Sequence, residues 1–124
     1  MSLSLDAKKE LSAALIKNNE LKQLVTGGFH NLVADDVAAF PRVVFSEITN
    51  RDQAYRDNHS AASEVRFQLS IFSKADTRKN ETEIAKQIDR LMKDLGYGRY
   101  DSVDLYETDT KIFHRGMRYV KTFF

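Results

Sequence analysis

The chain contains no cysteine, which excludes disulfide bonds, thiolate metal sites and a cysteine nucleophile. It also lacks an excess of either charge, because 19 Lys and Arg residues stand against 18 Asp and Glu residues, for a formal net charge of +1. A dedicated nucleic-acid-binding protein usually carries a basic patch or stripe, whereas here acidic and basic residues are interspersed. The sequence therefore predicts a mixed, solvated surface.

Long apolar segments are missing as well. No stretch approaches the roughly 20 apolar residues of a membrane-spanning helix, and Lys8, Lys9 and Glu10 stand where a secretory signal would be apolar. We therefore expect a soluble protein, made in the cytoplasm of its producing cell, with no membrane partner. With 42% hydrophobic residues, including 8 Phe and 5 Tyr, residues 1–124 are predicted to form a single domain. Within it, we treat residues 1–4 as vector-derived or disordered.

The clearest strand in the sequence covers residues 63–73. Apolar and polar residues alternate through it, which indicates one buried face and one face exposed to solvent or a partner subunit. The apolar residues are Val65, Phe67, Leu69 and Ile71, and the polar residues are Glu64, Arg66, Gln68 and Ser70. Segments rich in β-branched and aromatic residues predict three further strands, over residues 41–49, 101–107 and 112–123. The last two should form a hairpin, in which Gly116 indicates a bulge or a close backbone approach.

The clearest helix covers residues 80–95. Five apolar residues fall on one stripe at helical spacing: Ile84, Ile88, Leu91, Met92 and Leu95. Burying them is worth about 8–15 kcal/mol at about 1.5–3 kcal/mol each, so this helix must pack on the sheet. Asn80 with Glu83 is typical of a capping box, and Gly96 is a natural helix end. A second helix is predicted over residues 5–18.

The predicted architecture is α+β, a mostly antiparallel four-stranded sheet with two helices packed on one face, in the order α-β-β-α-β-β. A short helical turn at Leu21–Val25 follows the first helix and ends at Gly27-Gly28. Residues 29–40 are expected to be irregular, and residues 50–62 to form a polar connector longer than a tight hairpin requires.

No catalytic, metal-binding or cofactor-binding motif is found. The three histidines, His30, His59 and His114, lie in different segments without a second ligand at metal-binding spacing. We therefore expect no enzymatic activity, no metal and no cofactor. The rival interpretation is a small hydrolase or nuclease that uses His30, Asp35 and Asp36.

A second alternative is a small nucleic-acid-binding regulatory domain. Arginines are interleaved with aromatic residues that could stack on bases; the set is Arg51, Arg56, Arg66 and Arg99 with Tyr55, Phe67, Tyr97 and Tyr100. Acidic neighbours such as Asp52 and Asp101 offset the positive charge, so we expect no specific nucleic-acid partner.

Three segments resemble the tail-completion, or head–tail joining, proteins of long-tailed bacteriophages (siphoviruses) and prophages. FPRVVFSEITNRD is similar to their first strand, with an aromatic–Pro pair, a Val-rich strand and then a Glu. FQLSIFSKAD is similar to their second strand, and LMKDLGYGRYDSVDLYETDTKIFHRGMRYV to the end of the family's domain. The resemblance covers residues 10–124, and it brings no catalytic motif with it.

The resemblance implies a structural virion protein at the head–tail junction. Members of this family assemble as a ring, typically a hexamer, at the head-proximal end of the tail tube, where the ring meets the head connector. The implied partners are therefore the tail-tube protein, the head connector proteins and further copies of the chain itself.

The residues themselves indicate where such a surface lies. The connector at residues 50–62 contains no aliphatic residue larger than Ala and mixes Arg and Tyr, which are enriched at binding hot spots. We therefore predict that Arg51, Asp52, Tyr55 and Arg56 contact a partner protein.

Overall fold

The computed structural model describes residues 3–34, 39–56 and 59–124, apart from the side chains of Leu3, residues 54–56 and residues 59–60. The chain begins with a 3-10 turn, η1 (Leu3–Asp6), and helices α1 (Ala7–Lys17) and α2 (Asn19–Leu24). Strands β1 (Phe29–Asn31), β2 (Arg42–Arg56) and β3 (His59–Ser73) follow. A second 3-10 turn, η2 (Arg78–Asn80), leads into helix α3 (Glu81–Asp94) and strands β4 (Gly98–Glu107) and β5 (Ile112–Phe123). The α+β class is as predicted.

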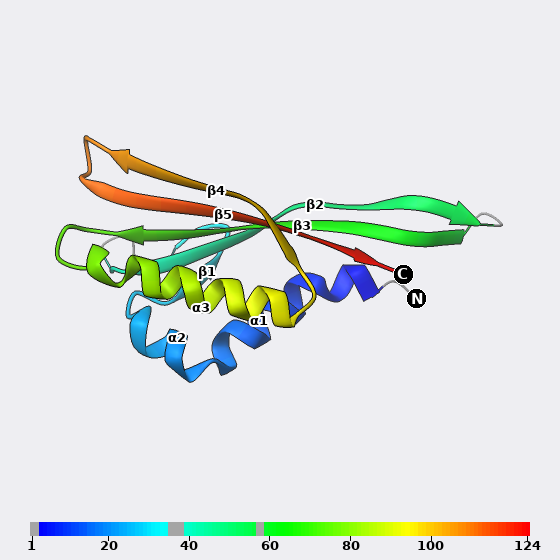
Figure 1. Cartoon of the computed structure of the whole chain (residues 1–124), viewed down its shortest axis with the longest axis horizontal. Coiled ribbons are helices and arrows are strands. Elements are labelled where there is room, and N and C mark those ends of the chain that lie inside the picture. The colour runs from blue at the N-terminus through cyan, green and yellow to red at the C-terminus, as the bar shows by residue number, and fades with distance from the viewer. Residues whose placement is uncertain (1–2, 35–38, 57–58) are drawn as a thin grey trace.

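The described strands form one five-stranded sheet in the order β1-β2-β3-β5-β4. Every neighbouring pair is antiparallel except β1 and β2, which run parallel. Figure 1 shows α1, α2 and α3 on the same side of this sheet. The opposite side, here called the open face, carries no helix among the described residues; its residues on β3 are Glu64, Arg66, Gln68, Ser70 and Phe72.

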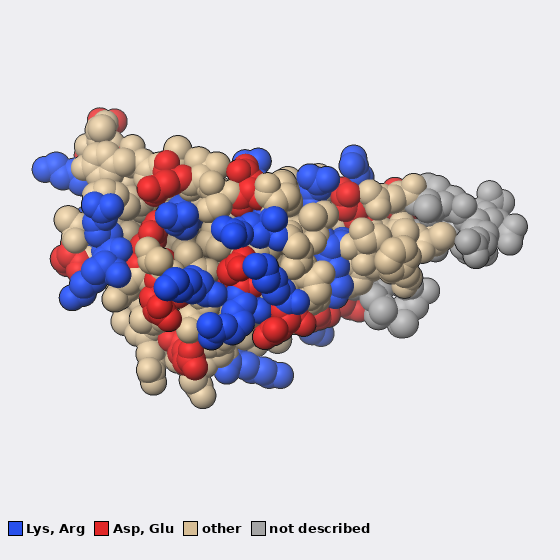
Figure 2. Space-filling view, in the orientation of Figure 1, with Lys and Arg blue, Asp and Glu red and all other residues tan. Residues whose placement is uncertain are grey.

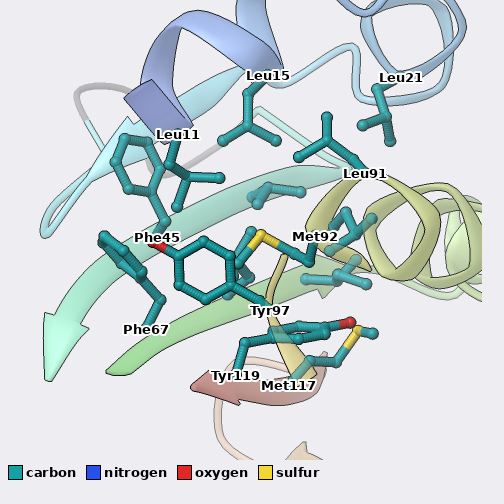
Figure 3. Close-up of a cluster of buried hydrophobic side chains, with 14 of the residues drawn as sticks. Leu11, Leu15, Leu21, Phe45, Phe67, Leu91, Met92, Tyr97, Met117 and Tyr119 are labelled. Atoms are coloured by element: carbon teal, nitrogen blue, oxygen red, sulfur yellow. The ribbon is translucent and has the colours of Figure 1, made fainter. Parts of the chain in front are cut away.

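The core lies between the helices and the sheet (Figure 3). The predicted alternation of β3 is confirmed, because Val65, Phe67, Leu69 and Ile71 are all fully buried. The predicted stripe of α3 packs against them: Ile84, Ile88, Leu91 and Met92 are buried, and Leu95 is partly buried.

The end of α3 delivers an aromatic side chain to this core. The Gly96 N–H donates to the Lys93 carbonyl (3.0 Å) and the Tyr97 N–H to the Met92 carbonyl (2.9 Å), while Gly96 takes φ +96°. This is the Schellman arrangement, in which glycine adopts the left-handed conformation at the helix end. Tyr97 then packs edge-on against Phe67, with 5.7 Å between the ring centroids.

The prediction that residues 50–62 form a connector is wrong. β2 continues to Arg56 and β3 begins at His59, so most of this segment is a two-stranded ribbon. Residues 51–53 are all exposed, and residues 61 and 62 are both partly exposed, so the alternation of buried and exposed side chains that marks a strand is absent there. The predicted strand bounds 41–49 and 63–73 are therefore too short.

The predicted four-stranded antiparallel sheet with two helices also needs correction. Residues 29–31 form β1, which makes the sheet five-stranded and mixed. The chain turns into a separate helix α2 because the Asn18 side chain accepts a hydrogen bond from the Leu21 N–H at 3.0 Å, which is N-cap geometry. Asn18 is therefore a helix start as well as an interruption, and the order is α-α-β-β-β-α-β-β.

The predicted capping box and the bulge predicted at Gly116 are wrong. Asn80 occupies the N-cap position of α3, but its side chain makes no capping hydrogen bond. β5 pairs without irregularity through Gly116, and the bulge of the predicted hairpin lies instead on β4, between Arg99 and Asp101. The hairpin itself is confirmed, with Glu107 opposite Ile112.

Candidate protein-interaction surface

The antiparallel pair of β2 and β3 extends beyond the rest of the sheet. β5 ends opposite Ser63, and β1 ends opposite Phe45. Beyond this point, residues 53–56 and 59–62, here called the hairpin arm, have no other strand partner within the described chain, and their pairing reaches Arg56 opposite His59. Figure 1 shows β2 and β3 projecting from one end of the molecule, with the C-terminus of the chain near the base of this projection.

A buried carboxylate holds the base of the arm. Glu64 accepts hydrogen bonds from Gln53 Nε2 at 2.8 Å and from Arg66 Nε at 2.9 Å, and Arg51 lies 3.5 Å away. The hydrogen bond from Arg66 lowers the pKa of Glu64, so this carboxylate is charged at neutral pH. The Arg66 guanidinium also stacks over the Tyr100 ring at 4.9 Å. The sequence placed Glu64 on a solvated face; what it could not reveal is that side chains from β2 cover it.

The four predicted interaction residues all lie on β2 and not on a loop. Arg51 has a 65% exposed side chain, and Asp52 is exposed while accepting a hydrogen bond from Ser63 Oγ at 2.7 Å. Tyr55 and Arg56 belong to the backbone ladder of the arm, and their side chains lie outside the described part of the structure. The structure thus places Arg51 and Asp52 at the base of the arm and Tyr55 and Arg56 towards its tip.

The open face consists of polar and apolar rows that cross the sheet. The row nearest the arm carries the Glu64 network, and a second row links Arg118 Nε to Gln68 Oε1 at 3.1 Å. Farther from the arm, Val103 and Leu105 of β4 are 41% and 50% exposed. This face is therefore hydrogen-bonded at the arm end and partly apolar at the other end.

His114 places a buried polar atom on the open face. His114 stacks on Phe72 with 4.3 Å between the ring centroids, and its Nε2 atom is buried without a hydrogen-bond partner among the described residues. Burial lowers the pKa of His114, and the Glu107 carboxylate opposes this only in part. The imidazole is therefore neutral at physiological pH.

A small polar groove of about 190 Å³ lies between α3 and the β4–β5 hairpin. Several of its charged side chains are engaged: Asp89 binds Lys93, Arg99 and Tyr119, and Arg115 binds Glu81 at 2.9 Å. These contacts fasten the helix to the sheet.

Of the three hydrolase residues named from the sequence, only His30 lies in the described part of the chain. His30 Nε2 lies 2.9 Å from the Gly27 carbonyl oxygen, whereas Asp35 and Asp36 lie outside the described residues. Among residues 3–34, 39–56 and 59–124, no group of three or more potential ligands is placed to hold a metal ion. No helix there combines the length and apolar character that a membrane span requires.

The aromatic residues proposed for base stacking are divided between core and surface. Phe67 and Tyr97 are buried, so neither can stack on a base, and Tyr100 is covered by Arg66. Figure 2 shows acidic and basic side chains interspersed over the visible face of the molecule, without a continuous basic stripe.

These features define a small α+β domain with one helical layer and a projecting β-hairpin. Residues 9–120 match the model of a protein family described as "Tail completion protein gp17". Because this match covers most of the chain, the protein belongs to the family of bacteriophage tail-completion proteins and is a structural component of the virion. Membership implies contact with other phage tail or head proteins. No curated protein matches the chain.

Proposed function

We propose that the protein completes the head-proximal end of a long phage tail and joins it to the head connector as a ring, hexameric as in the family that the sequence resembles. In this role it is made in the host cytoplasm and contacts the tail-tube protein below and connector proteins above. It acts without enzymatic activity, metal or cofactor. A ring of identical copies needs two different surfaces that are complementary to each other.

The hairpin arm is the observation that carries this proposal. A two-stranded ribbon with neither edge paired is marginally stable by itself, and residues 51–53, at its base, are all exposed. An arm anchored by the buried Glu64 and carrying Arg and Tyr fits a contact with another protein.

The arm can be tested by changing Arg51, Tyr55 and Arg56 to Ala together. Free energy of unfolding should stay within about 1 kcal/mol of the wild type, as is usual for surface substitutions. Joining of tails to filled heads, measured as infectious particles in a complementation assay and as free tails by electron microscopy, should fail. Normal joining would remove the arm from the interface.

A control variant separates the arm from a general loss of surface charge. Lys22, Lys79 and Arg90 are exposed residues on the helical side of the molecule. Their combined replacement by Ala removes three positive charges, one more than the arm variant removes, and joining should be unaffected. Equal failure of both variants would contradict a specific role for the arm.

A further inference from the structure

The described sheet has an open edge on each side. β4 pairs with β5 on one side, and no described strand pairs with its other side along its ten residues. β2 pairs with β1 only as far as Phe45, where the Leu32 N–H donates to the Phe45 carbonyl at 2.9 Å. From Ser46 onward the outer edge of β2 has no strand neighbour among the described residues. An open edge of this kind is a template for pairing with another chain.

The directions of the strands fix how two such edges can meet. β2 is antiparallel to β3, β3 to β5 and β5 to β4, so β4 runs opposite to β2. In a ring, neighbouring copies share one orientation. The β4 edge of one copy therefore lies antiparallel to the β2 edge of the next copy, which is the direction that gives the straighter hydrogen-bond ladder.

A groove beside the β2 edge is shaped to accept side chains from an added strand. It has a volume of about 430 Å³ and lies between α1 and the sheet where β1 ends. Its apolar lining includes Ala13, the 57% exposed Ile16 and Phe45, and its basic residues are Lys8 and Lys9.

The helix-facing side of β4 has the complementary chemistry. Asp104 and Tyr106 lie opposite Arg115 and Phe113 of β5, on the face of the sheet that carries the helices. Both are exposed at the edge of the sheet. An acidic residue next to an aromatic residue matches a groove that is apolar inside and carries two lysines.

We propose that β4 of one copy adds to the outer edge of β2 in the next copy, and that Asp104 and Tyr106 enter the groove beside α1. This rests on the proposed ring and names the two edges that close it. Pairing of β4 with another β4 is disfavoured, because three acidic residues on each strand would face each other; these are Asp101, Asp104 and Glu107, against the single basic Arg99.

A charge exchange tests the contact. Asp104→Lys, or Lys8→Glu with Lys9→Glu, should each reduce the yield of joined particles at least about tenfold, because like charges then meet in the interface. Combining all three substitutions should restore joining to within a few-fold of the wild type. Failure of the combined variant, with each variant folded by circular dichroism, would overturn the pairing of these groups.

A matched control uses Asp109, which is exposed in the turn between β4 and β5. Asp109→Lys changes the net charge of the chain by the same amount as Asp104→Lys, but it leaves the β4 ladder untouched. We expect joining to be retained. An equal loss with Asp109→Lys would mean that net charge, and not the groove, controls assembly.

Cysteine cross-linking gives a direct readout, because the chain has no cysteine of its own. A double variant, Tyr106→Cys with Ile16→Cys, should form a ladder of disulfide-linked multimers in assembled tails, and neither single variant should. We expect no such bond within one copy, because Ile16 of α1 lines the groove with Asn31 of β1 and Phe45 of β2, and β2 is separated from β4 by two strands, about 14 Å, whereas a disulfide requires Cα atoms within about 7 Å.

The outcomes separate this inference from the proposed ring. Rings seen by electron microscopy without the cross-linked ladder would overturn the edge pairing and leave the ring in place. Dimers formed by Tyr106→Cys alone would show pairing of β4 with β4 and would also overturn it. Absence of any ring in assembled tails would overturn both.

Discussion

Replacing Asp89 by Asn should loosen the attachment of α3 to the sheet. The Asp89 side chain is 21% exposed and accepts a hydrogen bond from the buried Tyr119 hydroxyl at 2.9 Å. It also binds Lys93 Nζ at 2.6 Å and lies 3.3 Å from Arg99 Nε. One carboxylate thereby joins α3 to β5 and to the start of β4. The amide of Asn keeps one acceptor oxygen but loses the attraction to both cations.

The expected loss is about 1–2 kcal/mol in the free energy of unfolding at pH 7. Hydrogen bonds to a charged group are worth about 1.5–3 kcal/mol, and this figure is reduced here because the Lys93 and Arg99 side chains are partly exposed. A loss of this size is a substantial fraction of the free energy of unfolding of a small domain.

The effect should also depend on pH. Burial raises the pKa of Asp89, but the hydrogen bonds from Lys93 and Tyr119 and the charge of Arg99 outweigh it and leave the pKa below its ordinary value. A carboxyl group with a lowered pKa in the folded state stabilises the protein above its unfolded pKa of about 3.9, and this contribution is lost as the pH falls through the folded pKa. The difference between wild type and Asp89→Asn should therefore shrink below about pH 4.

Urea denaturation followed by circular dichroism at several pH values measures this difference. Asp94→Asn is the matched control, because Asp94 is exposed in the last turn of α3, where a negative charge opposes the helix dipole. That variant should change stability by no more than about 0.5 kcal/mol. An equal loss in both variants, or a difference for Asp89→Asn that stays constant from pH 7 to pH 3, would refute the reasoning.

Two further predictions concern packing. Phe67→Ala should lower the free energy of unfolding by about 3–5 kcal/mol, because Phe67 is fully buried against Tyr97. Phe124→Ala, at a 96% exposed position, should change it by less than about 0.5 kcal/mol. Similar losses for the two variants, measured by chemical denaturation, would contradict the placement of Phe67 in the core. Gly27→Ala should cost about 1–3 kcal/mol, because its Cβ would lie 2.6 Å from the Pro41 carbonyl oxygen. A Cβ atom at Gly98 would have no atom within 4 Å, so Gly98→Ala should leave the stability nearly unchanged. Thermal melts of the two glycine variants measure this difference.

Strong periodicity made part of this fold predictable. β3 and α3 each have one buried face, so the alternation at Val65–Ile71 and the stripe at Ile84–Met92 identify the elements and their buried sides. β1 and the arm could not be found in this way. β1 is three residues long, which is too short to show a period. At the base of the arm residues 51–53 are all exposed, so the alternation that marks a strand is absent there.

The sequence identified the segment that holds the candidate interaction residues, but it did not identify that segment as a pair of strands. Arg51 and Asp52 are exposed, as the composition of residues 50–62 indicated. The length of this segment also identified a feature not explained by turn geometry. The sequence could not show which arginines are available to contact a partner protein. Their availability depends on side-chain pairs such as Arg66 with Glu64 and on the strand register that sets the neighbours of each side chain.

The two open edges raise the question of what would keep free copies from pairing at once. Natural edge strands are protected by charges and by bulges, and both devices are found here. β4 carries three acidic residues and an irregularity at Arg99–Asp101, and β2 has register shifts between Glu47 and Thr49 and again beyond Asp52. Backbone pairing alone is therefore weak at either edge. In the proposed ring, the groove beside α1 adds the attraction of Lys8 and Lys9 for Asp104, which a random encounter of two edges lacks. Edge pairing then becomes favourable only in the one orientation that places β4 beside α1, and that orientation is the one that a ring on the tail tip imposes.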